Sequence, residues 1–296
     1  MHTRRRFLAG AAAVGSLAGC LAPRQVDHAA YSTAGDTIPD VDYEGVQQRA
    51  TEAGYRVAGP YYVNAKRELG RPLDVPALTE QFGADARVVL TQFRYSPTRF
   101  LEADFTAQGS GVRLVFFDDD LGYGQPFEPA NLPPDDWLRD RFGLLFDLTE
   151  SETDALLAAV KAAAAGAEDN IVTHDVDHEP TLTAVHGAFS EAATETSVSP
   201  TYGDGWANVE FRDDDGVLGQ FSVVVPSVRI STTDGGHDYR IKLDRLGGLN
   251  LVVLLDAGDT IPESEYRSQF REMFEALGLP ADRVAEYTFE YTPSNW

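Results

Sequence analysis

The strongest constraint on the fold is a pattern of apolar strand, loop and helix that occurs twice along the chain. The strand Val112–Phe117 runs into Asp118, and the strand Leu251–Leu255 runs into Asp256. Each is followed by a helix with three apolar residues at the i, i+3, i+4 spacing of one buried face. These residues are Phe142, Leu145 and Phe146 in the first copy and Phe270, Met273 and Phe274 in the second. We therefore expect two duplicated halves.

The order of the predicted elements indicates the fold class. Helices are expected over residues 43–53, 75–83, 134–147, 150–165, 181–193 and 263–277. Strands are expected over residues 54–63, 87–95, 99–106, 112–118, 206–211, 218–231, 238–244, 249–255 and 284–291. Turn residues at Asp213–Gly216 and Asp234–Gly236 indicate antiparallel pairing. Because helices flank the runs of strands, we expect an α+β fold in which each half is an antiparallel sheet packed with helices.

Changes in composition predict the boundaries of these halves. The first repeat is expected over residues 43–166 and the second over 181–296, with an acidic linker between them at 167–180. Residues 20–42 are small, polar and interrupted by proline, without periodicity. We expect them to form a flexible tether, whose reach at ~5–6 Å × √n would be roughly 25 Å.

The N-terminus carries the features of an export signal. Arg4 and Arg5 precede a short apolar run, which ends in Leu17, Ala18, Gly19 and Cys20. The run from residue 7 to residue 19 is shorter than the ~20 residues of a membrane-spanning helix. Residues 3–20 resemble the signal and lipobox of haloarchaeal twin-arginine-exported lipoproteins. This resemblance implies cleavage before Cys20, its lipidation, and a location on the outer face of the cytoplasmic membrane.

Composition agrees with a protein that faces molar salt. The chain has a net charge of −23, and removal of residues 1–19, which contain three arginines and no acid, would bring it to −26. Lysine occurs only at Lys66, Lys161 and Lys242, a pattern similar to that of haloarchaeal proteins. At 1 M salt the Debye length is ~3 Å, so dense negative charge repels little. The absence of a basic patch disfavours nucleic-acid binding.

Two segments are candidate ligand sites. His174, Asp175, Asp177 and His178 combine imidazole and carboxylate groups that Zn²⁺ or Mn²⁺ accepts. The alternative is an acidic linker between the halves, in which the histidines add solubility. The second candidate is the long loop between Asp118 and Pro134, where clustered aspartates suit a hard cation and aromatic residues suit a sugar or a partner. Its candidate residues are Asp118, Asp119, Asp120, Tyr123 and Phe127. A solvated turn is the alternative for this loop.

Catalytic motifs do not occur in the sequence. It has no Gly-x-Ser-x-Gly elbow, no His-Glu-x-x-His pair and no phosphate-binding glycine loop. We therefore expect a membrane-anchored surface lipoprotein that binds a protein or small-molecule ligand or acts as a scaffold, without a required cofactor. An anchored, metal-assisted extracellular hydrolase and a solute-binding component of a transporter are the alternatives. The predicted antiparallel halves weaken the solute-binding alternative, because solute-binding proteins of transporters usually have parallel α/β lobes.

Overall fold

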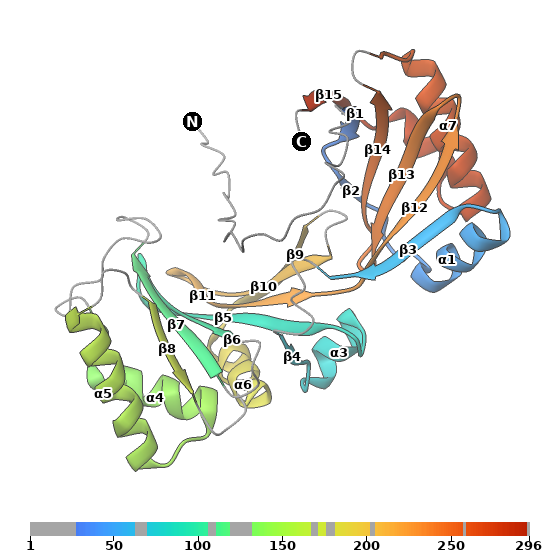
Figure 1. The fold of residues 1–296 in the computed structure, drawn as a ribbon. Helices are drawn as coiled ribbons and strands as arrows, with labels where there is room; N and C mark the ends of the chain where they lie inside the picture. Colours follow the sequence, from blue (N-terminus) through green and yellow to red (C-terminus); the bar gives the residue numbers. More distant parts are fainter. Residues whose placement is uncertain are drawn as a thin grey trace, which may run out of the picture.

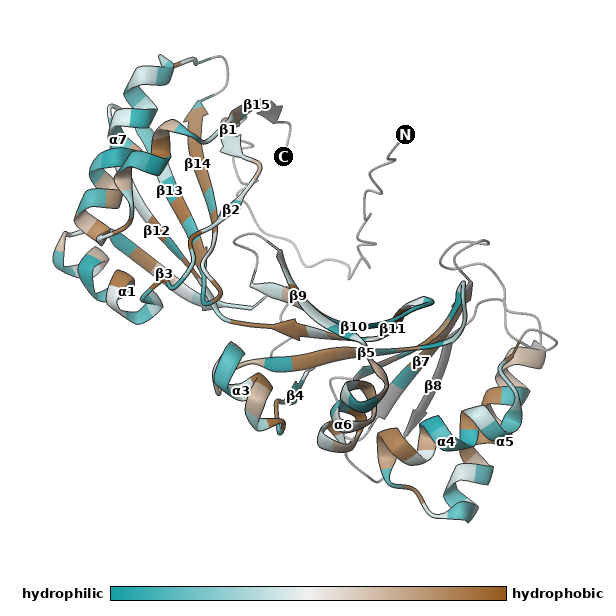
Figure 2. Cartoon of the chain, turned by 180° about the vertical axis from the view of Figure 1, so that it is seen from behind, coloured by the Kyte–Doolittle hydropathy of each residue, from teal (hydrophilic) through white to brown (hydrophobic). Residues whose placement is uncertain are grey.

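The structure is a computed structural model in which two antiparallel sheets form the framework (Figure 1). It describes residues 28–62, 70–105, 111–118, 132–166, 171–175, 181–201, 205–256 and 259–294. Helices cover one face of each sheet, and Figure 2 shows from behind that α3, α4 and α6 lie on the same side of their sheet. The predicted α+β fold with two antiparallel sheets is confirmed.

Sheet A combines the two ends of the described chain. Its seven strands are, in spatial order, β15 (Phe289–Ser294), β1 (His28–Thr33), β14 (Gly248–Asp256), β13 (His237–Asp244), β12 (Ser227–Asp234) and β3 (Arg56–Tyr61), with β2 (Asp36–Thr37) paired to β14. Its helical elements are α1 (Tyr43–Glu52), α7 (Glu263–Leu277) and the short 3-10 helix η3 (Ala281–Ala285). The apolar faces of α1 and α7 close a core with alternate residues of the strands.

Sheet B is built from the middle of the chain. Its eight strands are, in spatial order, β8 (Ile171–Asp175), β7 (Gly111–Asp118), β6 (Arg99–Phe105), β5 (Arg87–Ser96), β11 (Gly216–Val224), β10 (Trp206–Asp213) and β9 (Glu195–Thr201), with β4 (Arg71–Pro72) paired to β5. Its helices are α3 (Pro76–Phe82), α4 (Asp135–Phe146), α5 (Glu150–Gly166) and α6 (Leu182–Ala192). Their apolar residues form a second core, separate from that of sheet A.

The elements that suggested a duplication have the same order in both sheets. Strands β6 and β7 are followed by α4, and strands β13 and β14 are followed by α7. The predicted helical faces are confirmed, because all six of their apolar residues are fully buried. The duplication itself stays a prediction.

The sheets do not follow the predicted boundaries. Residues 20–42 were expected to be a tether, but their segment His28–Thr33 is β1, which pairs with β14 on one side and β15 on the other. Residues 43–61 were assigned to the first repeat, yet β3 pairs with β12. Long-range pairing therefore places β1 and β3, the first strands of the described chain, in the same sheet as its last strands. Local sequence patterns cannot reveal such pairing.

Three further predictions need correction. The expected strand 218–231 is two strands, because the chain passes from sheet B to sheet A at Val225 and Pro226. The expected strand 284–291 begins only at Phe289, after η3. The linker 167–180 contains a strand, β8, at the edge of sheet B.

The crossing between the sheets is held by backbone and side-chain hydrogen bonds. The Val225 N–H donates to the Gly205 carbonyl at 2.8 Å, and the Arg245 N–H donates to the Pro226 carbonyl at 3.1 Å. The Asp244 carboxylate, which is fully buried, accepts from the Gly205 N–H at 3.3 Å. The last bond joins β13 of sheet A to the loop before β10 of sheet B.

Candidate functional site

The sequence-predicted site residues fall largely outside the described residues. This holds for Arg4, Arg5 and Cys20 of the export signal and for Asp119, Asp120, Tyr123 and Phe127 of the long loop. Asp118 is the last residue of β7. The proposed export signal and ligand loop therefore stay predictions.

The structure describes two of the four residues that were predicted to bind a metal ion. His174 and Asp175 lie in β8, where their Cα partners on β7 are Val112 and Gly111. Asp177 and His178 lie outside the described residues. Within the described ranges, no group of three or more His, Cys, Asp or Glu side chains is placed to hold a metal ion.

A different set of polar side chains gathers on sheet B. In β10 and β11, Ala207, Val209 and Phe221 point into the helix-packed core. Successive side chains of a strand point to opposite faces, so the residues between them lie on the face away from these helices. There the register places Asn208 opposite Ser222, and Glu210 opposite Gln220.

The same polar rows continue across the next strands. Gln220 is opposite Gln92 of β5, and Gln92 is opposite Glu102 of β6. Asp104 of β6 is opposite Arg113 of β7. We call this set the polar face. It consists of Gln92, Glu102, Asp104, Arg113, Trp206, Asn208, Glu210, Gln220 and Ser222.

Side-chain hydrogen bonds connect the centre of the polar face. The Trp206 Nε1–H and the Ser222 hydroxyl both donate to Asn208 Oδ1, at 3.1 and 2.9 Å. The Gln220 Nε2–H donates to Ser222 Oγ at 3.2 Å, and the Gln92 Nε2–H donates to Glu102 Oε1 at 3.0 Å. Ser222 is only 1% exposed and Glu102 8% exposed, whereas the amide residues are half-buried. The bonds between neighbouring strands hold these groups in one arrangement.

Arginines neutralise the carboxylates at the margin of this face. Arg212 pairs with Glu210 at 2.7 Å, and Arg113 pairs with Asp104 at 3.0 Å.

A third pair lies at the end of β10, where the Arg94 guanidinium donates to the Asp213 carboxylate and lowers the pKa of that carboxyl. Each pair removes the repulsion that a lone carboxylate would meet in so acidic a chain.

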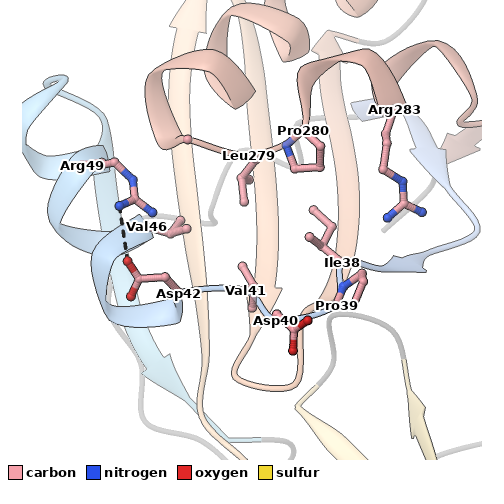
Figure 3. A pocket seen from close by; sticks show the side chains of 11 residues that line it. Ile38, Pro39, Asp40, Val41, Asp42, Val46, Arg49, Leu279, Pro280 and Arg283 are labelled. Carbon is pink, nitrogen blue, oxygen red and sulfur yellow. Dashed lines mark hydrogen bonds and ion pairs between the residues drawn. The ribbon is translucent and has the colours of Figure 1, made fainter.

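Sheet A carries a pocket of about 390 Å³ between the start of α1 and the link from α7 to η3. Figure 3 shows apolar side chains directed into its middle and an arginine at each end. The apolar lining consists of Ile38, Pro39, Val41, Val46, Leu279 and Pro280. The arginines are Arg49 and Arg283.

Both arginines of the pocket bind the protein itself. The Arg49 Nε–H donates to the Leu277 carbonyl at 2.6 Å, and its Nη1 donates to Asp42 Oδ2 at 3.3 Å. Arg283 donates to the Thr37 carbonyl at 3.0 Å and pairs with Asp36. The Arg49 bonds tie α1 to the end of α7, and the Arg283 bonds tie β2 to η3, so these pocket residues have a structural role. The polar face is the better candidate for a binding site.

The polar face was not predicted from the sequence. A signal exists in the alternation of apolar and polar residues, for example Ala207, Asn208, Val209, Glu210 and Phe211 in β10. The β10–β11 turn predicted at Asp213–Gly216 is confirmed by the pairing of its two end residues. However, a bulge shifts the register between Phe211 and Arg212, and a count from the turn would place Asn208 opposite Phe221 instead of Ser222.

Comparisons with known proteins give no family for this chain. No family model and no curated protein matches it. One solved structure, titled "Structure of PH1012 protein from Pyrococcus Horikoshii OT3", aligns with 86% of this chain and 92% of its own, at 8% identity and a TM-score of 0.20. This likeness is too low to carry an argument about fold or function. Among the described residues, every helix is too short or too polar to cross a membrane.

Proposed function

We propose that this chain is a surface protein, exported by the twin-arginine route and anchored through a lipid on Cys20, that binds a ligand on the polar face of sheet B without chemical change. The hydrogen-bonded set of Trp206, Asn208, Ser222 and Gln220 carries the proposal. Binding sites place a small number of oriented polar groups on a rigid support. Here the support is two paired strands of a packed sheet, β10 and β11.

The composition of this face also supports binding. The chain has 47 acidic residues and only 15 amide residues, six Asn and nine Gln. Antiparallel sheets often expose one face to water, and a solvated face of so acidic a protein would be expected to carry mainly Asp and Glu. Instead, Gln92, Gln220 and Asn208 occupy adjacent strands at its centre. Neutral donors and acceptors at the centre of this face therefore support a role in ligand binding over that of a merely hydrated surface.

The anchor is tested in the cells that export the protein. In the wild type, intact-mass measurement of the membrane fraction should give a chain that begins at Cys20 and carries lipid. Cys20→Ser should abolish the lipid mass. Arg4→Lys with Arg5→Lys should leave the unprocessed chain in the cytoplasm. A wild-type chain of unmodified full mass would contradict the lipoprotein assignment.

The binding surface is tested with the full chain carrying Cys20→Ser, so that a lipid cannot hold it to membranes. We expect this chain to co-sediment with cell envelopes in about 2 M salt. Gln92→Ala with Gln220→Ala should lower the retained fraction about tenfold. The matched control is Gln269→Ala, a half-buried glutamine on α7 of the other sheet. Equal retention of both variants would exclude the polar face as the binding surface.

A further inference from the structure

The free hydrogen-bonding groups of the polar face include both donors and acceptors. Asn208 Oδ1 accepts two hydrogen bonds, so the orientation of this amide is fixed and its Nδ2 can donate outward. Gln220 and Gln92 each use Nε2 as a donor within the protein. Their Oε1 atoms, like Asn208 Nδ2, have no partner among the described residues. The face therefore offers acceptors from two strands and a donor from a third.

This combination distinguishes between classes of ligand. An anion needs donors only, and a cation needs acceptors only. A hydroxyl group donates and accepts at once, and neighbouring hydroxyls on a ring match a row of mixed donors and acceptors. The Arg212–Glu210 and Arg113–Asp104 pairs balance two of the three carboxylates of the face, and the third, Glu102, is only 8% exposed. The face therefore presents mainly neutral groups to a ligand.

An aromatic ring lies beside these groups. Trp206 is half-buried, and its Nε1–H is bonded to Asn208, so the indole is held next to the amide row. A flat aromatic ring with a fixed polar edge can pack against the C–H face of a sugar while amides bind its hydroxyls. Trp206 is the first residue of β10.

We propose that the polar face binds an uncharged glycan, with Gln92, Asn208 and Gln220 bonded to its hydroxyl groups and Trp206 packed against a sugar ring. This inference rests on the proposed function, because it names the ligand of the same face. The glycan is a component of the cell envelope on which the anchored protein would lie.

The test compares envelopes before and after mild periodate oxidation, which cleaves the vicinal diols of sugars. The probe is the full chain with Cys20→Ser, in about 2 M salt, with melting temperatures to verify that each variant is folded. We expect retention on oxidised envelopes to fall about tenfold. Trp206→Ala should lower retention on untreated envelopes by a similar factor, and Trp206→Phe, which keeps an aromatic ring, should restore most of it.

The possible failures are distinguishable. If the chain is not retained on untreated envelopes, the proposed function fails and the glycan assignment fails with it. If retention depends on Gln92 and Gln220 but is unchanged by oxidation, the polar face binds a protein or lipid component and only the glycan inference is overturned. Retention of Trp206→Ala at the wild-type level, with a normal melting temperature, would remove the ring contact from the proposal.

Discussion

The carboxylate of Asp244 in sheet A accepts a hydrogen bond from the backbone N–H of Gly205, the residue just before β10 of sheet B, at 3.3 Å. Its other oxygen accepts from the N–H groups of Leu246 and Gly248, at 2.9 and 2.8 Å. Gly205 has a positive φ of 69°, and a Cβ there would lie 2.5 Å from the Val225 carbonyl oxygen. Two properties therefore fix the crossing between the sheets. Asp244 supplies a buried acceptor, and position 205 requires a residue without a side chain.

Asp244→Asn should destabilise the protein by about 1–3 kcal/mol, the cost of leaving a buried polar group without its partner. The amide oxygen can still accept from Leu246 and Gly248, but the amide nitrogen would face the Gly205 N–H, donor against donor. Denaturant unfolding in about 2 M salt measures the loss. Asp238→Asn on the same strand is the control, because its ion pairs with Arg56 and Arg240 are partly exposed and worth less. Equal losses would contradict the junction role.

A chain that begins at Tyr43 should fail to form sheet A. It lacks β1, so the facing backbone groups of β14 and β15 lose their partners, and Tyr31 no longer stacks on Tyr266 at 5.2 Å. A chain that begins at Asp27 keeps all of these contacts and serves as the control. Circular dichroism melting in about 2 M salt compares them. Equal melting temperatures would show that β1 is dispensable.

Local patterns predicted most helices and the strands that alternate strongly, because those signals depend on near neighbours. The α7 prediction matched both observed ends, Glu263 and Leu277. The strand β1 was missed because Ala29, Ala30 and Ser32 carry little hydrophobic signal. Ala29 is buried because β1 pairs with β14 and β15 and its side chain joins the core of sheet A, which is a long-range effect.

The candidate site was missed for a different reason. Its residues come from strands far apart in sequence, and their alignment depends on three bulges. These shift the β10–β11 register between Phe211 and Arg212, the β11–β5 register between Ser222 and Val223, and the β5–β6 register between Arg94 and Ser96. A one-residue shift exchanges the faces of a strand, so Gln92 and Gln220 could not be placed side by side from the sequence.

Arg49→Lys should destabilise the protein by about 1–2 kcal/mol. The Arg49 guanidinium donates to the Leu277 carbonyl at the end of α7 and to Asp42, which also accepts from the Gly45 N–H at the start of α1. An ammonium group has one nitrogen and cannot reproduce both bonds in this geometry. Arg271→Lys, on the exposed side of α7, should change stability little. The free energy of unfolding is measured with denaturant. Equal values for Arg49→Lys and Arg271→Lys would mean that the hydrogen bonds of Arg49 add nothing to stability.

Tyr239→Phe should reduce the loss of stability at high pH. Burial, followed by the charges of Glu265 and Asp234, raises the pKa of Tyr239 to about 12. Because the folded state favours the protonated phenol, its contribution is complete below the ordinary pKa of ~10 and is lost as the pH rises toward about 12. The Tyr239 hydroxyl is buried without a hydrogen-bond partner among the described residues, so its removal should cost nothing at pH 7.

The measurement is the free energy of unfolding from pH 8 to pH 12 in about 2 M salt. The wild type should lose stability steeply above pH 10, and Tyr239→Phe should lose less. The slope should not vanish, because burial also raises the pKa of Tyr287 to about 12. Tyr291→Phe, at a side chain 45% exposed, is the control and should follow the wild type. A variant at Tyr239 with the wild-type slope would mean that this phenol ionises as readily in the folded chain as in the unfolded one, which its packing against Phe270 in the core opposes.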